Sequence, residues 1–458
     1  MELLPDEVLL QVLGRLDTRQ LLRVRRVCRQ WHCLALDPDA WRHRDLECFD
    51  EDAYGVSLRR APCARSLSVM ERHWEMAAAT GCAARRLSVT MRASGDATVA
   101  RATDVIRRQV QLGRLEDLSV SVCFGSSGGR RAFMAMMRVV NSAGTLARVS
   151  IDHTLPLQEA AEPGDAACPA AAPPARLTHL TYTSAVQDSG AELLLRSHAA
   201  TLEVARLRNT VGNLDWARLP AFPSLRSLEC PVMQGMECLL RCPRLERLKL
   251  TVDLPEGARR DQPGLAGVRQ LLRDATQLKS LVFVYGNFDK READLVLSLG
   301  AASPVRPRAL ELLTFCYSRY LPKEGRDVLQ RNLSLVLPRL PRLAKLALSF
   351  PPSSELLASI DPCSAPSLRR LASDFAWEEG LCGHCWWHSA EVRALMQRHP
   401  SLHLVTERCV RSCGRGFCVG NCHQLPTGKV GSSGHPDDQP CDASLGHGDP
   451  SVTWITAL

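Results

Sequence analysis

Residues 1–46 combine an apolar stripe with signals that start and stop helices. Pro5 followed by Asp6 and Glu7 is typical of a first helical turn, because proline has no N–H to lose there and acidic side chains favour the positive end of a helix. The next apolar residues recur at steps of three and four and therefore share one helix face: Leu9, Val12, Leu13 and Leu16. The pattern predicts a helix of about ten residues, which Gly14 ends or loosens in its last turn.

Two further short helices are predicted downstream. Asp17 and Gln20 have the spacing of a capping box, which starts a second helix containing Leu21 and Val24. A third helix follows and stops near Asp37, because the proline after it disfavours helical geometry. Isolated helices shorter than about 12–15 residues are marginal in water, so the apolar stripe needs a partner. That partner is either the rest of the chain or another protein, and the physical pattern alone favours neither.

Beyond residue 46 the dominant pattern is a six-residue unit, L-x-x-L-x-Φ, in which Φ is apolar. Its fourth positions, weaker copies included, are Leu67, Leu87, Leu118, Val149, Leu180, Leu207, Leu228, Leu248, Leu281, Leu313, Leu346 and Leu371. The interval between successive positions varies, from a short one between Leu67 and Leu87 to a long one between Leu248 and Leu281. Each unit predicts a short strand followed by a helical return, and intervals above about 30 residues indicate full helices in those returns.

The order of residues in the first segment resembles an F-box along its whole length: Leu4-Pro5-Asp6-Glu7, Leu9, Leu13, Leu16, Leu21-Leu22, Val24, Val27-Cys28, Trp31, Leu34-Ala35 and Trp41. The resemblance implies that this segment binds the small Skp adaptor, which connects it to a cullin scaffold and a ubiquitin-conjugating enzyme. The residues that the resemblance assigns to adaptor binding are Leu4, Pro5, Leu9, Leu13, Leu16, Leu21, Val24, Cys28, Trp31 and Trp41.

The repeated units resemble a leucine-rich repeat solenoid. In such a stack no unit buries its apolar face alone, so neighbouring units share one core. The resemblance implies an α/β fold in which a three-helix F-box is followed by a horseshoe of about 12 units. The expected organisation is an F-box at 1–46, a transition at 47–62, a solenoid at 63–405 with a flexible insertion at 155–176, a cysteine-rich cap at 406–424 and a disordered tail at 425–458.

Strand alternation indicates which side chains are available to a partner. With the leucines inward, the intervening residues face the concave surface of the solenoid. The candidate substrate-binding residues on that surface are Ser119, Ser150, Thr181, Glu229, Lys249 and Thr314. Their mixed polarity does not identify the partner, and only a minority of such a surface is expected to matter energetically.

A cluster of cysteines follows the repeats. Cys382 and Cys385 form a C-x-x-C pair, and Cys409 and Cys413 follow. Four such thiols are sufficient for a tetrahedral structural zinc site. The alternative is a set of reduced cysteines near the end of the solenoid, and no other cofactor is expected.

Composition and charge restrict the remaining possibilities. The 458 residues are 45% apolar and 23% charged, which is typical of a soluble protein with more than one core. Neither a run of about 18 apolar residues nor a signal peptide is visible, so we expect no membrane association and a cytoplasmic or nuclear location. The net charge of +8 is modest for this length and, without stacking or groove chemistry, does not indicate nucleic-acid binding.

Catalytic motifs are absent from the sequence: it has no phosphate-binding glycine loop, no nucleophile elbow and no H-E-x-x-H. We therefore expect a non-catalytic protein. One hypothesis is the substrate receptor of a Skp–cullin–F-box ubiquitin ligase, which accelerates transfer by proximity. The other is a non-degradative F-box and leucine-rich repeat scaffold.

Overall fold

The computed structural model describes the chain at residues 4–48, 51–92, 95–122, 130–153, 176–184, 189–208, 214–252, 263–286, 294–301, 308–317, 323–374, 386, 389–407 and 452–454. The chain divides into two compact units. Unit 1 comprises Met1–Leu214 with Leu219–Leu225, and unit 2 comprises Asp215–Arg218 with Arg226–Leu458.

Unit 1 begins with four short helices: α1 (Asp6–Arg15), α2 (Thr18–Val24), α3 (Arg29–Ala35) and α4 (Pro38–Trp41). The predicted capping box is present, with the Gln20 N–H donating to Asp17 Oδ1 at 2.6 Å and the Asp17 N–H donating to Gln20 Oε1 at 3.0 Å. The three-helix prediction misses α4, because Pro38 also occupies the first turn of a new helix. Asp37 caps that helix by accepting the N–H of Asp39 at 2.8 Å.

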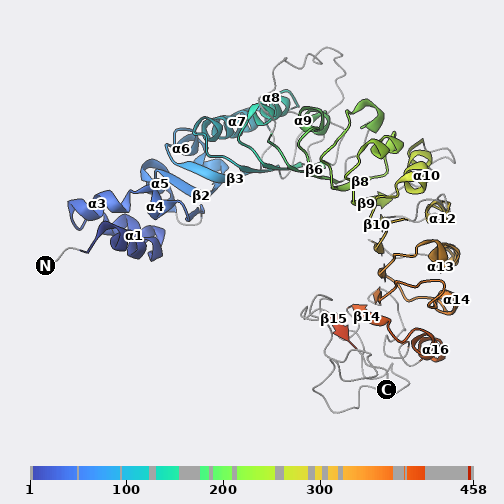
Figure 1. The fold of residues 1–458 in the computed structure, drawn as a ribbon. Coiled ribbons are helices and arrows are strands. Elements are labelled where there is room, and N and C mark those ends of the chain that lie inside the picture. The colour runs from blue at the N-terminus through green and yellow to red at the C-terminus, as the bar shows by residue number, and fades with distance from the viewer. Residues whose placement is uncertain are drawn as a thin grey trace. The chain divides into compact units, whose positions relative to one another are not determined.

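Seven parallel strands follow in unit 1, each hydrogen-bonded to the next in chain order: β1 (Asp45–Leu46), β2 (Cys63–Met70), β3 (Ala83–Met91), β4 (Asp117–Val122), β5 (Arg148–His153), β6 (His179–Ser184) and β7 (Val204–Arg208). The helices between them lie along one face of this sheet (Figure 1): α5 (Glu51–Arg60), η1 (Glu71–His73), α6 (Trp74–Ala78), α7 (Asp96–Gln111), α8 (Arg130–Ser142) and α9 (Gly190–His198). The described strands form an open sheet.

The strand register of unit 1 is compatible with the predicted repeat pattern. Leu67 pairs with Leu87, and Leu118 pairs with Val149, so the fourth residues of successive units lie side by side. All four are buried. The leucines therefore form a continuous row under the helices, as expected for units that share one core.

One of the predicted fourth positions, Leu207, is wrong. The partner of Leu180 is Ala205, whereas Leu207 pairs with Tyr182. The unit therefore begins at Leu202, and Ala205 occupies the position that a larger aliphatic residue holds in the neighbouring units. Ala205 is fully buried. The leucine pattern does not identify this position, because the buried residue there is alanine, which is apolar but smaller than leucine.

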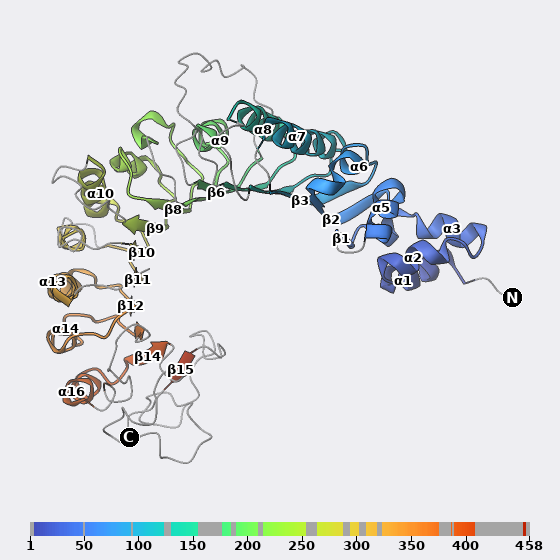
Figure 2. The ribbon, with the colours of Figure 1, turned by 180° about the vertical axis from the view of Figure 1, so that it is seen from behind.

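Unit 2 contains seven more parallel strands, again paired in chain order: β8 (Ser227–Pro231), β9 (Arg247–Val252), β10 (Ser280–Tyr285), β11 (Leu312–Tyr317), β12 (Lys345–Leu348), β13 (Arg370–Asp374) and β14 (His403–Glu407). Its helices again lie on one side of the strands (Figure 2): η2 (Trp216–Arg218), η3 (Met236–Arg241), α10 (Pro263–Asp274), α12 (Leu297–Gly300), α13 (Lys323–Val336), η4 (Leu337–Arg339), α14 (Ser354–Ser359) and α16 (Ala390–Arg398). Ring stacking links neighbouring strands in the core, for example Phe283 with Phe315 at 5.3 Å between centroids.

The interval between strands sets the size of the returning helix. The long intervals from position 87 to 118 and from 118 to 149 enclose α7, which has 16 residues, and α8, which has 13 residues. The shorter interval from position 228 to 248 leaves room only for η3, a 3₁₀ helix of 6 residues. The expectation that long intervals contain full helices is confirmed in these units.

Several details differ from the expected organisation. The predicted transition contains α5, and β1 and β14 lie beyond the 12 predicted fourth positions. Within the predicted tail, Val452–Trp454 form β15, which pairs antiparallel with β14. Valine, threonine and tryptophan all favour strands, so this triplet departs from the expected disorder. Residues 154–175, which make up nearly all of the predicted insertion, lie outside the described residues. Among the described helices, none has the length and apolarity needed to cross a membrane.

Candidate functional site

Arg44 joins the end of α1 to α4. Its Nη2 donates to the Leu13 carbonyl at 2.7 Å, its Nη1 donates to the Leu16 carbonyl, and its Nε donates to the Ala40 carbonyl at 2.7 Å. Carbonyl groups in the last turn of a helix have few partners within the helix, and Arg44 supplies donors to two of them at the end of α1. The Leu13 carbonyl also accepts the Leu16 N–H at 3.2 Å. Burial lowers the pKa of Arg44 below its ordinary value, and the charge of Asp17 opposes that shift.

Trp41 fills the centre of this helical segment. Its side chain is fully buried, and its Nε1–H donates to the Ala35 carbonyl at 2.7 Å. The Arg44 guanidinium carbon lies 5.9 Å from the centre of the Trp41 ring, within the range of a cation–π contact. Trp41 therefore holds α3 and α4 together, and its side chain is inaccessible to a partner in this conformation.

The structure sorts the predicted adaptor-binding residues by exposure. Buried inside the unit are Leu9, Leu13, Leu21 and Trp41. Half-buried are Leu16, Val24 and Trp31, and exposed are Leu4, Pro5 and Cys28. The side chain of Cys28 caps α3 by accepting the N–H of Trp31 at 3.5 Å, so it starts this helix rather than lying within it. The predicted set thus contains both the core of the segment and part of its surface.

An exposed apolar stripe runs along α1. Leu4 is 55% exposed, Val8 40% and Val12 47%. Val8 and Val12 are four residues apart on one face of α1, and Leu4 directly precedes Pro5, the cap residue of this helix. Val27, in the turn between α2 and α3, is 65% exposed. Among the described residues, the other large exposed apolar side chains are only Leu297 and Leu335. Four of these six thus lie between Leu4 and Val27, and such a concentration is typical of an interaction site.

Val8, Val12 and Val27 were missed as site residues. The sequence signal for the first two was present, since Leu4, Val8 and Val12 repeat at every fourth residue. The pattern of three- and four-residue steps also contains Leu9 and Leu13, and the sequence alone does not show which side of α1 faces inward.

The start of α3 lies beside the start of α1, because Gln30 Nε2 donates to Asp6 Oδ1 at 2.8 Å.

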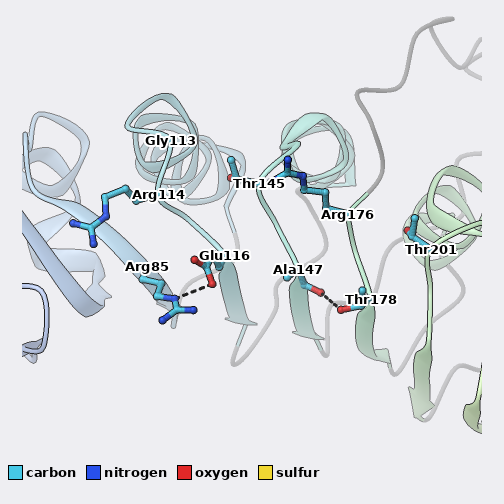
Figure 3. Close-up of a pocket in the computed structure, with 9 residues that line it drawn as sticks. All are labelled: Arg85, Gly113, Arg114, Glu116, Thr145, Ala147, Arg176, Thr178 and Thr201. Atoms are coloured by element: carbon cyan, nitrogen blue, oxygen red, sulfur yellow. Dashed lines mark hydrogen bonds and ion pairs between the residues drawn. The ribbon is translucent and has the colours of Figure 1, made fainter.

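Two hollows open on the described part of unit 1. The first, of about 620 Å³, lies at the edge of the sheet where strands β4 to β7 begin (Figure 3). The second, of about 450 Å³, lies over the sheet face that carries the predicted substrate-binding residues.

A row of hydroxyl groups forms part of the second hollow. Ser119 pairs with Ser150, and Ser150 pairs with Thr181, so the three predicted residues lie side by side on adjacent strands. Register extends the row to Ser88 and Ser68, which sequence reasoning missed because their repeat copies are weak. No hydrogen bond within the described residues occupies these five side-chain hydroxyls. We call this set the hydroxyl row.

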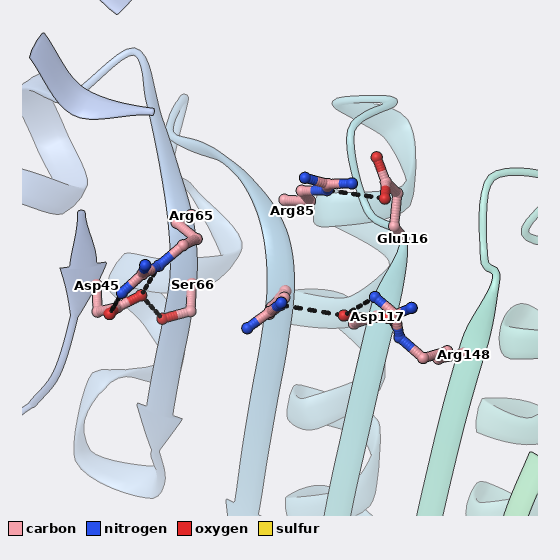
Figure 4. A network of polar contacts seen from close by, with 8 residues as sticks. Asp45, Arg65, Ser66, Arg85, Glu116, Asp117 and Arg148 are labelled. Atoms are coloured by element: carbon pink, nitrogen blue, oxygen red, sulfur yellow. Dashed lines mark hydrogen bonds and ion pairs between the residues drawn. The ribbon is translucent and has the colours of Figure 1, made fainter. Parts of the chain in front are cut away.

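Charged side chains border the hydroxyl row. Asp117 accepts Arg148 Nη2 at 2.7 Å and forms an ion pair with Arg86 Nε at 3.1 Å (Figure 4). A neighbouring network joins Asp45 to Arg65. One carboxylate between two guanidiniums leaves a net positive charge beside the hydroxyl row, and these pairs fix the orientation of the long arginine side chains.

The three candidates of unit 2 lie in one register row. Glu229 pairs with Lys249, Lys249 with Val282, and Val282 with Thr314. Lys249 Nζ lies 3.0 Å from Glu229 Oε1, so these two charges already neutralise each other. In this row the ion pair of Glu229 and Lys249 therefore lies next to the aliphatic side chain of Val282.

Metal binding by the predicted cysteines is not tested, because Cys382, Cys385, Cys409 and Cys413 lie outside the described residues. Within the described ranges, no group of three or more His, Cys, Asp or Glu side chains could hold a metal ion. Buried thiols such as Cys230 and Cys82 are poor nucleophiles, because burial raises the pKa of both, that of Cys82 to about 12.

The N-terminal segment matches a known family. Residues 1–47 match the family model described as F-box-like. The matched segment contains α1 to α4 and β1, including the exposed apolar stripe and the Arg44 contacts. F-box domains generally bind adaptors of the Skp type. The chain thus carries an F-box-like domain at its N-terminal end, which supports its assignment as an F-box protein.

Proposed function

We propose that the protein is the substrate-binding subunit of a Skp–cullin–F-box ubiquitin ligase. The observation that carries the proposal is the exposed apolar stripe of Leu4, Val8 and Val12 on the F-box-like segment. The stripe docks on the Skp adaptor, and the adaptor connects the chain to a cullin scaffold.

Burial supports this division of roles. Leu9 and Leu13, on the inner side of α1, pack inside the unit and are 6% and 1% exposed. The helices thus have a core of their own, and the outer stripe remains available. Fully burying a valine or leucine side chain contributes roughly 1.5–3 kcal/mol, so a few such residues at the centre of an interface are sufficient anchors.

The sheet faces hold the protein to be ubiquitinated. In unit 1 the hydroxyl row and its bordering arginines offer hydrogen-bond donors and positive charge, and in unit 2 Lys249, Val282 and Thr314 offer mixed chemistry. The subunit performs no bond-making step. It raises the local concentration of a target beside the ubiquitin-conjugating enzyme, which converts a bimolecular encounter into an effectively intramolecular one. This role places the protein in the cytoplasm or nucleus.

Co-purification with the Skp adaptor tests the docking step. Tagged wild-type chain is expected to retain the adaptor, and Leu4→Ala/Pro5→Ala is expected to lose most of it. Both positions are exposed, so the variant should keep the wild-type circular dichroism spectrum. Equal recovery of the adaptor with the variant, or no recovery with wild type, contradicts the proposal.

Depletion of the protein separates a ligase receptor from a non-degradative scaffold. Proteins captured by the wild-type chain are compared with those captured by a variant carrying Ser119→Arg and Ser150→Arg in the hydroxyl row. A partner lost from that variant should accumulate on depletion if the chain is a receptor. A partner whose level and half-life are unchanged identifies a scaffold instead.

A further inference from the structure

The hollow at the edge of unit 1 lies outside both the apolar stripe and the predicted substrate face. It opens where the chain enters β4, β5, β6 and β7, and its volume is about 620 Å³. Its charged lining residues are Arg85, Arg114, Glu116 and Arg176 (Figure 3). Nothing in the adaptor-docking function uses it.

Its lining follows the repeat. Arg114, Thr145, Arg176 and Thr201 each directly precede the leading leucine of one unit, in four successive units. Because β4 to β7 are in register, these residues form a row of alternating guanidinium and hydroxyl groups. Arg114 and Arg176 start from loops two strand spacings apart, which is about 10 Å.

The hollow carries uncompensated positive charge. Arg85 Nε is 2.8 Å from Glu116 Oε2, so this pair is neutral. Arg114 and Arg176 are both exposed, and neither has a carboxylate partner among the described residues. Three arginines and one glutamate leave a formal charge of +2 in the lining.

Hydroxyl groups complete the site. Thr145 Oγ1, between the two arginine positions, is buried and has no hydrogen-bond partner. Thr201 Oγ1 donates to the Leu177 carbonyl at 2.9 Å, which leaves its lone pairs available to a ligand N–H. A buried hydroxyl without a partner is unfavourable, so a ligand that supplies one gains by occupying the hollow.

We propose that this hollow binds an acidic polypeptide segment of a partner protein, with one carboxylate on Arg114 and one on Arg176. Guanidinium forks pair well with carboxylates, and two arginines on separate repeats suit two separated acids better than one compact anion. A segment in polyproline II conformation presents residues i and i+3 on the same side, about 9 Å apart, which matches the arginine spacing. None of the described residues that line the hollow is aromatic, so they offer no ring for the base stacking of single-stranded nucleic acid.

Fluorescence anisotropy with the full chain tests the proposal. The probe is a fluorescein-labelled peptide, SGEPPEGS, and the comparison peptides are SGQPPQGS and SGEEPPGS. We expect the first peptide to bind about tenfold more tightly than the glutamine peptide and more tightly than the peptide with adjacent acids. Arg114→Gln/Arg176→Gln should weaken binding of the first peptide about tenfold, and added salt should weaken it in the wild type.

A matched control keeps the loss of net charge equal. Arg60→Gln/Arg101→Gln also removes two exposed arginines from unit 1, away from the hollow, and should change the affinity less than about twofold. Thr145→Val should weaken binding about threefold without lowering the melting temperature, because it removes a buried hydroxyl that has no partner in the free protein.

Three results overturn the proposal: equal losses in the two double variants, equal affinity for all three peptides, or tighter binding of oligodeoxythymidine that displaces the peptide. Adaptor recovery should be normal in Arg114→Gln/Arg176→Gln. Failure of this proposal is therefore distinguishable from failure of the docking function.

Discussion

The Arg44 guanidinium donates to the Leu13 carbonyl oxygen at 2.7 Å, and this contact joins residues 31 positions apart in the sequence. It fixes the end of α1 against the segment that leads into β1. The exposed apolar stripe belongs to the same helix, so the orientation of the stripe depends on a residue that contributes no apolar surface itself.

Replacement of Arg44 should therefore destabilise the F-box-like segment without touching its docking surface. Arg44→Met keeps an unbranched side chain but removes the Arg44 donors from the carbonyls of Leu13, Leu16 and Ala40. The Leu13 carbonyl still accepts the Leu16 N–H at 3.2 Å. We expect a loss of about 2–4 kcal/mol, measured by urea unfolding, because each unsatisfied carbonyl costs about 1–3 kcal/mol and water will replace part of the loss.

The neighbouring Arg42 provides the control. It forms a surface ion pair with Asp39, at 3.1 Å, and its Nε donates to His43 Nε2 at 3.1 Å. Both contacts are exposed, so Arg42→Met should cost no more than about 1 kcal/mol. Equal effects of the two substitutions would show that the carbonyl contacts of Arg44 do not hold the helices together.

The corrected repeat register gives a second prediction. Ala205 is fully buried opposite Leu180, so Ala205→Leu should overpack this unit and cost about 1–3 kcal/mol in thermal or urea unfolding. If Leu207 instead held the repeat position, Ala205 would tolerate leucine. An unchanged or increased stability of Ala205→Leu would support the register in which Leu207 holds the fourth position.

The parallel, repeat-like arrangement of the strands could be predicted because its signal is redundant. Large apolar residues recur at register positions from Leu67 to Leu371, and one wrong position, at Leu207, did not disturb the rest. The helical returns followed from spacing alone, since a short strand cannot fill an interval such as that from Leu87 to Leu118. The short helix α4 is not predicted, because Pro38 both disfavours helical geometry in the residue before it and suits the first turn of a new helix.

The candidate site was less predictable because it depends on which side of a helix faces inward. Val8 and Val12 differ from Leu9 and Leu13 by one residue along α1, yet the first pair is exposed and the second buried. Tertiary contacts determine which side of α1 faces inward. They include those of Arg44 and Trp41, which lie about 30 residues away in the chain. Likewise, Ser68 and Ser88 join the hydroxyl row only through strand register.

A pH dependence is expected at the start of the sheet. Arg65 Nε donates to Asp45 Oδ1 at 2.8 Å, and this contact, with the Ser66 hydroxyl, holds the pKa of Asp45 below its ordinary value of 3.8. A carboxyl group whose pKa is lower in the folded state stabilises the fold above its ordinary pKa, and this contribution is lost as the pH falls through the folded value.

Asp45→Asn tests that dependence. It should lower the free energy of unfolding by up to about 1 kcal/mol at about pH 6, because the pair is largely exposed. The difference from wild type should shrink as the pH is lowered from about 4 to about 2. A difference that stays constant across this range would mean that the Asp45 charge is not the cause.

The affinity of the purified chain for the purified Skp adaptor tests the central claim most directly. Val8→Glu/Val12→Glu places two charges on the exposed apolar stripe without altering the core, since both positions are 40% exposed or more. We expect the dissociation constant to rise at least about thirtyfold, the size of a central interface residue's contribution. Gln11→Glu, on the same helix, is exposed and already polar, and should bind like wild type. An unchanged dissociation constant for Val8→Glu/Val12→Glu would contradict docking through this stripe.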